Sequence, residues 1–163
     1  MKEADLMVKD MDKMKKLDFT KVFLAHGHDE KLKLEVSRFL EKLSIKPIIL
    51  HEQPNEGKTI IEKIELNTDV GFAIVLYTPC DIGGKNKDNL QKRARQNVVF
   101  EHGYLIGKLG RDRVVALIKD NDLEIPSDIS GIIYIPYSSD WKFEIAKELK
   151  NAGYDVDLNK LLK

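Results

Sequence analysis

The chain has 163 residues, a length that suits one domain with a single core. Its 27 Lys and Arg residues balance 27 Asp and Glu residues, so its charge gives no reason to expect nucleic acid or an anionic membrane as a direct partner. The single cysteine, Cys80, cannot form an intramolecular disulfide, and the longest apolar run is too short to cross a bilayer. We therefore expect a cytoplasmic protein.

Residues 1–18 differ from the rest of the chain. They are charged throughout, and Met7, Met11 and Met14 recur at helical spacing. We interpret this segment as an N-terminal helical tail or a linker, and we expect the domain itself to occupy residues 19–163. The sequence leaves open whether residues 1–18 are a native N-terminus or a linker.

Short apolar runs alternate with helical patterns over the rest of the chain. The predicted strands are Lys21–Ala25, Lys46–Leu50, Val70–Tyr77, Arg113–Ile118 and Gly131–Pro136. Between the third strand and the next helix, residues 78–96 are polar and are predicted to form a solvated loop. Residues 119–130 are only weakly helical.

Capping residues mark the predicted helices. One helix begins near Asp29. A second begins at Thr59, where Glu62 completes a capping box. A third, within "RARQNVVFEHGYLIGKLG", ends at Gly110, a residue type suited to the position after a helix. The last helix is expected to begin after Asp140, its predicted cap.

The alternation predicts an α/β protein with a parallel sheet and helices on both faces. Five strands in about 140 residues fit, by analogy, a flavodoxin-like doubly wound sheet with strand order 2-1-3-4-5. In such sheets a ligand binds at the carboxyl edge, here between the first and third strands. The loops that leave these two strands cover residues 25–29 and 78–96.

Glu101 lies in the first or second turn of the helix that follows the third strand. It is off the centre of the apolar stripe of that helix, so we expect it to face sideways into the crevice. A glutamate there can also serve only to complement the helix dipole. His102 falls nearer the centre of the stripe, and we expect it to pack in the core.

The loop "AHGHD" offers Gly27 for close backbone approach, with His26 and His28 as hydrogen-bonding side chains. Two histidines in a loop can bind a metal, but no acidic or cysteine companion lies at ligand spacing, so we expect no metal site. Cys80 shows no feature of a nucleophile beyond its place in a loop.

Several long motifs occur in an order that is familiar. They are "VFLAHGHDE", "ILHEQPNEGKTIIEKI", "FAIVLYTPCDIGG", "RARQNVVFEHGYLIGKLG" and "IPSDISGIIYIP". Together they resemble the TIR-like domain of bacterial anti-phage proteins, which is often fused to cyclic-nucleotide sensors. The resemblance covers roughly residues 20–160, almost the whole chain.

The resemblance implies a TIR fold and cleavage of NAD⁺ to nicotinamide and linear or cyclic ADP-ribose. It implies that Glu101 is the catalytic residue and that the loop "HEQPNEGK" moves and mediates assembly, with Glu56 lining the ligand site. Many members carry an aromatic residue where Asn97 stands here. We also expect His26, Gly27, Asp81, Arg95 and Asn97 to contact the substrate.

The implied partners follow from the same resemblance. NAD⁺ is expected as substrate, with no separate cofactor. We also expect self-association through TIR contacts and a fused or separate cyclic-nucleotide sensor domain. The activating signal and the geometry of the oligomer stay open.

One carboxylate can suffice for this reaction. Cleavage of an N-glycosidic bond passes through an oxocarbenium-like state, and nicotinamide leaves NAD⁺ as a neutral molecule, so no general acid is needed. Two alternatives remain. One is a non-catalytic TIR interaction module, and the other is an enzyme resembling nucleoside deoxyribosyltransferases, which also place a glutamate nucleophile in a flavodoxin-like fold.

Overall fold

A computed structural model describes residues 17–54, 56–127, 131–138 and 140–162. The prediction for residues 1–18 therefore falls, apart from its last two residues, outside the described part of the chain. Leu17 packs against the core, and Asp18 forms an isolated bridge with Val70.

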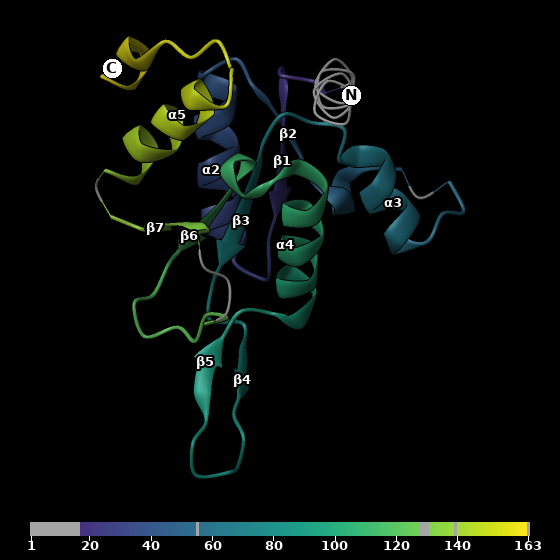
Figure 1. Cartoon of the computed structure of the whole chain (residues 1–163), viewed down its shortest axis with the longest axis vertical. Helices are drawn as coiled ribbons and strands as arrows, with labels where there is room; N and C mark the ends of the chain where they lie inside the picture. The colour runs from purple at the N-terminus through teal and green to yellow at the C-terminus, as the bar shows by residue number, and fades with distance from the viewer. Residues whose placement is uncertain (1–16, 55, 128–130, 139, 163) are drawn as a thin grey trace, which may run out of the picture.

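The core of the fold is one sheet of five strands. They are β1 (Lys21–Ala25), β2 (Lys46–Ile48), β3 (Ala73–Tyr77), β6 (Val114–Ile118) and β7 (Ile133–Pro136). Their order is β2-β1-β3-β6-β7, and every neighbouring pair is parallel (Figure 1). This confirms the flavodoxin-like order and the pairing of the first and third predicted strands. All of β3 is buried, because helices cover both of its faces.

Two helices pack on each face of the sheet (Figure 1). Helices α2 (Glu30–Lys42) and α5 (Trp141–Asn151) share one hydrophobic cluster with alternate strand residues such as Ile74 and Leu76. On the other face, α3 (Ile60–Asn67) and α4 (Gln96–Leu109) share a second cluster with residues such as Val75 and Tyr77. The described ranges also contain three short 3₁₀ helices: η1 (Leu50–Glu52), η2 (Arg111–Arg113) and η3 (Leu158–Leu161).

Three of the four predicted helix boundaries are set by their expected caps. The Asp29 carboxylate accepts the Leu32 backbone N–H at 3.0 Å. Thr59 and Glu62 form the complete capping box. Gly110 follows α4 with φ of 98°, a conformation that glycine adopts without strain. Asp140 precedes α5 as predicted, but its side chain makes no capping hydrogen bond.

The polar segment between β3 and α4 differs from the prediction. It contains an antiparallel hairpin of β4 (Asp81–Gly83) and β5 (Gln91–Arg93), which projects beyond the sheet (Figure 1). Gly84 lets the two strands approach closely, since a Cβ there would lie 1.9 Å from the Asn89 carbonyl oxygen. A bond from the Glu124 N–H to the Lys92 carbonyl oxygen (2.8 Å) joins the base of the hairpin to the body.

The connection between β6 and β7 contains turns and no helix within its described residues, 119–127 and 131–132. None of the helices in the described ranges is long and apolar enough to cross a membrane.

Candidate functional site

Glu101 lines a pocket at the carboxyl edge of the sheet. Helix α4 buries the stripe that contains Val98, His102 and Leu105, so Glu101, one residue before His102, faces sideways from that stripe. The pocket has a volume of about 70 Å³ and lies between β1, η1, α3 and α4. Its lining consists of Leu24, His26, Leu50, His51, Ile60, Lys63, Arg95, Asn97 and Glu101.

Burial dominates the electrostatics of Glu101. Loss of water around the carboxyl group raises its pKa to about 7, while the nearby Arg95 guanidinium acts in the opposite direction. Arg95 is the residue directly before α4, and Asn97 lies in the first turn of that helix. At neutral pH the carboxyl group is therefore divided between its two protonation states. A cation bound beside it would favour the ionised one.

His26 follows β1 and lines the same pocket, and one of its ring nitrogens has no hydrogen-bond partner among the described residues. Its Nδ1 lies 2.8 Å from the Gly27 carbonyl oxygen. Because a carbonyl oxygen can only accept a hydrogen bond, Nδ1 carries the proton. Burial lowers the pKa of His26, so the ring is neutral at pH 7 and Nε2 is an acceptor. Nε2 is buried and has no hydrogen-bond partner among the described residues. One residue of the pocket lining thus carries an unpaired acceptor, in addition to the Glu101 carboxyl group.

Two further polar residues of the pocket were missed by the sequence reasoning. His51 is the second residue of η1, three residues after the end of β2, and its ring contacts the His26 ring at a centroid distance of 5.6 Å. Lys63 of α3 is 4% exposed, and its Nζ donates to the Gln53 carbonyl oxygen at 3.0 Å. The place of His51 after a predicted strand was a usable signal. The inward position of Lys63 became evident only once the packing of α3 was known.

The loop after β3 lies in a different pocket from Glu101. Thr78, Pro79 and Cys80 line a space of about 320 Å³ together with His28, Asp29 and Lys119. The single crevice expected between the loops that leave the first and third strands is therefore divided in two, and His26 belongs to the Glu101 side.

Gly27 lies between the two pockets and lines neither. It is needed for a close approach to protein, since a Cβ there would lie 2.5 Å from the Cys80 sulfur. Asp81 stands in β4 opposite Arg93 and lines neither pocket. Glu56 is exposed, has φ of 43° and pairs with Lys58, also away from the pocket lining. Substrate contacts by these three residues stay predictions.

His102 is a core residue, as expected. It is fully buried, and its Nδ1 lies 2.8 Å from the Tyr77 hydroxyl oxygen. Burial lowers its pKa to about 4, so the ring is neutral. It fixes α4 against β3 and thereby fixes the direction in which Glu101 points.

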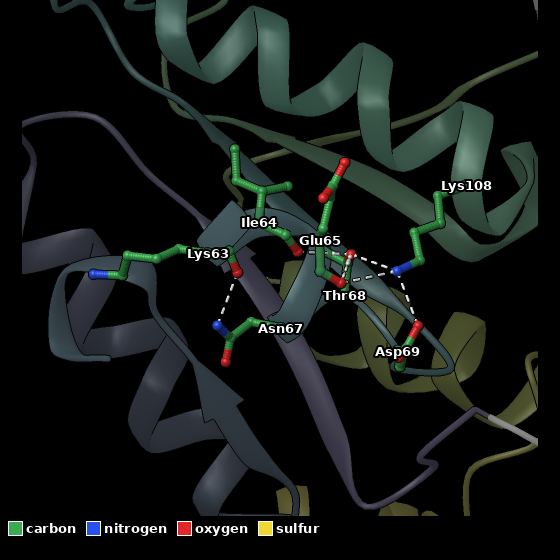
Figure 2. Close-up of polar contacts among 7 residues, drawn as sticks. All are labelled: Lys63, Ile64, Glu65, Asn67, Thr68, Asp69 and Lys108. Atoms are coloured by element: carbon green, nitrogen blue, oxygen red, sulfur yellow. Dashed lines mark hydrogen bonds and ion pairs between the residues drawn. The ribbon is translucent and has the colours of Figure 1, made fainter. Parts of the chain in front are cut away.

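Figure 2 shows how the C-terminal end of α3 is fastened to α4. The Lys108 Nζ contacts the Glu65 carbonyl oxygen (3.1 Å), the Thr68 hydroxyl oxygen (2.9 Å) and the Asp69 carboxylate (2.9 Å). These contacts hold the C-terminal end of α3. The opposite end, beginning at Ile60, forms the edge of the Glu101 pocket.

The described residues contain no group of three or more His, Cys, Asp or Glu side chains placed to hold a metal ion. The polar groups of the pocket, a carboxyl group, two imidazole rings, an amide and the side chains of Arg95 and Lys63, are suited instead to a polar organic ligand.

The five-stranded parallel sheet in this order is the flavodoxin-like arrangement of TIR domains, and here a partly buried glutamate lies on the helix after the third sheet strand. Residues 21–139 match the family described as the CAP12/Pycsar effector protein, TIR domain. The chain belongs to this family of anti-phage signalling effectors.

Relatives differ in how much of their length this chain covers. The chain is 44% identical over 146 residues to YuaY of Escherichia coli (strain K12), which is 87% of this chain and 48% of YuaY. It is 39% identical over 145 residues to tirC of Dictyostelium discoideum, which is 82% of this chain and 72% of tirC. A match at 40% identity over 52 residues links it to the Pycsar effector protein XpPycTIR of Xanthomonas perforans, covering 31% of this chain and 17% of that protein. The chain thus spans about half the length of YuaY.

Proposed function

We propose that this domain hydrolyses NAD⁺ at the bond between nicotinamide and ribose. In the balanced reaction, NAD⁺ and water give nicotinamide, ADP-ribose and a proton. The observation that carries the proposal is the desolvated Glu101 carboxyl group, with its pKa near 7, in a pocket that also holds Arg95 and neutral His26.

The chemistry needs few groups. The electrons of the breaking C–N bond pass to the pyridinium ring, which leaves as neutral nicotinamide, and positive charge develops on the ribose. An ionised Glu101 stabilises that charge and accepts hydrogen bonds from the ribose hydroxyls. The unprotonated His26 Nε2 is a second acceptor for a hydroxyl, and Arg95 is suited to a phosphate oxygen.

The volume of the pocket indicates that it must open to work. The pocket volume is about 70 Å³. Pockets that enclose organic ligands such as NAD⁺ range from roughly 300 to 1,000 Å³. We infer that the first turn of α3 and the preceding loop move outward, since α3 is fastened at its other end (Figure 2). Contact with a second copy would then hold the opened site in one arrangement.

The role of the whole protein extends the same proposal. The family contains Pycsar effectors and CD-NTase-associated protein 12. We propose that a cyclic-nucleotide sensor, fused or separate, clusters these domains during phage infection and thereby switches on NAD⁺ depletion. A domain that was fully active as a monomer would drain the NAD⁺ of its own cell.

The decisive experiment follows nicotinamide release from NAD⁺ by purified protein over a wide range of concentrations. Glu101→Gln should lower the rate roughly 10²- to 10³-fold. Glu144→Gln, an exposed change on α5, is the matched control and should leave the rate unaltered. Undiminished cleavage by Glu101→Gln would remove this residue from the mechanism.

The same samples separate the alternatives. Transfer between deoxynucleosides without NAD⁺ cleavage would identify a deoxyribosyltransferase-like enzyme. No turnover of either substrate by assembled protein would identify a non-catalytic interaction module.

A further inference from the structure

The β4–β5 hairpin has an apolar face with no partner in the described part of the chain. We name its residues 82–92 the arm. Ile82 and Leu90 are 70% and 55% exposed. Ile82 stands opposite Lys92, and alternation along the strand places Leu90 on the same face as Lys92. An exposed pair of this kind on a projecting hairpin is a candidate contact surface.

The arm is attached to the body only near its base. Lys92 pairs with Asp120 at 3.6 Å, and the Glu124 N–H donates to the Lys92 carbonyl oxygen at 2.8 Å. Within the described ranges, no hydrogen bond or ion pair joins residues 84–90 to the body. A two-stranded hairpin is marginally stable alone in water, so a partner that covers its apolar face would stabilise it.

A second exposed surface lies on α3, beside the Glu101 pocket. We name the side chains of Ile60, Ile61, Glu62 and Glu65 the α3 face. Both isoleucines are 57% exposed, and Ile60 is also part of the pocket lining.

The charges of the two surfaces are complementary. The arm carries Lys85 and Lys87 against one Asp88, besides Lys92, which pairs with Asp120 of the body. Residues 52–66, which include the α3 face, carry four glutamates and two lysines. Lys58 and Glu56 form an ion pair with no net charge, and Lys63 donates to the Gln53 carbonyl oxygen, so the other three glutamates leave this surface negative. Arm against arm would bring positive charges together, whereas arm against α3 brings opposite charges together.

We propose that the arm of one copy of this chain docks on the α3 face of the next copy. The arm leaves the body at the N-terminal end of α4 and points away from it, while α3 lies alongside α4, so the contact forms between copies (Figure 1). Because the two surfaces differ, the contact is head-to-tail and yields a ring or an open chain of copies.

Docking would also complete the site, and this consequence rests on the proposed function. Ile60 belongs both to the α3 face and to the pocket lining. An arm seated there would cover the edge of the neighbour's Glu101 pocket and hold the first turn of α3. Association is measured separately from NAD⁺ cleavage, so failure of one proposal is distinguishable from failure of the other.

The test uses two variants that each disable one surface. Ile82→Ser changes the arm and Ile61→Ser changes the α3 face, and both replace exposed side chains outside the pocket lining. Sedimentation velocity over a dilution series should show concentration-dependent assembly of the parent chain. Each variant alone should need an at least ~10-fold higher concentration. Leu162→Ser, at an 84% exposed site, is the control and should assemble like the parent.

Mixing the two variants gives the sharpest result. Each retains one working surface, so an equimolar mixture should form dimers and nothing larger. A parent chain that stays monomeric throughout overturns the proposal. So does normal assembly of Ile61→Ser, which would indicate an arm-to-arm contact, or weakened assembly of the Leu162→Ser control.

The mixture also assigns the completed pocket to one protomer. Adding Glu101→Gln to the Ile82→Ser chain, which keeps the intact α3 face, should remove the activity gained on mixing. Adding it to the Ile61→Ser chain should not. The reverse pattern overturns completion of the site by docking. Dimers without any NAD⁺ cleavage would leave docking intact and overturn the proposed hydrolase.

Discussion

Because Glu101 is shielded from water, this one residue is predicted to make a pH-dependent contribution to the free energy of unfolding. Its pKa is about 7 in the folded protein against an ordinary 4.5, so the folded state binds more protons between these values. The free energy of unfolding therefore falls as pH rises through this range. Glu101→Gln should raise it by about 1–3 kcal/mol at pH 8 and change it little at pH 5.

Urea denaturation at the two pH values checks this, with Glu144→Gln as control. An equal effect of Glu101→Gln at both pH values would contradict the raised pKa. The rate of NAD⁺ cleavage by the parent chain should change with pH in the opposite sense to its free energy of unfolding. It should rise with pH through about 7, because the proposed mechanism uses the ionised carboxylate.

Gly27 gives a second test at the residue scale. A methyl group at this position would lie 2.5 Å from the Cys80 sulfur and 3.4 Å from the Thr78 hydroxyl oxygen. We expect Gly27→Ala to lower the free energy of unfolding by about 1–3 kcal/mol through overpacking. Cys80→Ala removes the sulfur, so the double variant should recover part of this loss. Chemical denaturation of the single and double variants measures the recovery, and strictly additive losses would contradict the contact.

Which site residues could be predicted depends on what sets their position. Glu101, His26, Arg95 and Asn97 follow strand ends or start a helix, so the order of elements was enough to bring them to one edge, and the structure places them in one pocket. Lys63 depends on which side of α3 faces inward, and one sequence does not fix that.

At the scale of elements, the attachment of α3 to α4 can be tested at Lys108. Lys108→Met removes the cation that binds the C-terminal end of α3 (Figure 2). We expect a loss of about 1 kcal/mol, since the contacts are partly exposed to water. Urea denaturation measures the loss, with Lys147→Met on the exposed side of α5 as control. Equal effects of the two changes would show that Lys108 contributes no more than an ordinary surface lysine.

The hairpin shows why an element can escape sequence reasoning. Strands β4 and β5 have three residues each and contain few apolar or β-branched residues, so no strand pattern was present. What forms the hairpin is the close approach permitted by Gly84 and the register that places Asp81 opposite Arg93. Both are properties of the paired strands and neither is visible in one of them alone.

At the scale of the molecule, alternation of strands and helices was sufficient to predict a parallel sheet, and analogy supplied its order. The apolar pattern of the strands, on which the prediction of a parallel sheet depends, reflects their burial. The strand β3 is apolar along its whole length because it is covered on both faces, and its five residues are all buried. The assignment of α2 and α5 to one face and of α3 and α4 to the other required the structure.

That division of the sheet has a consequence for tolerance of mutation. Along β3, Ile74 and Leu76 face the α2–α5 side, whereas Ala73, Val75 and Tyr77 face the side that carries Glu101. A deep mutational scan scored separately for protein abundance and for NAD⁺ depletion should therefore show a period of two. Because all five residues are buried, substitutions at either parity would reduce abundance, but those on the Glu101 side would reduce depletion by more than the loss of abundance explains. The sheet would act as a partition between the part of the sequence selected mainly for folding and the part selected for chemistry.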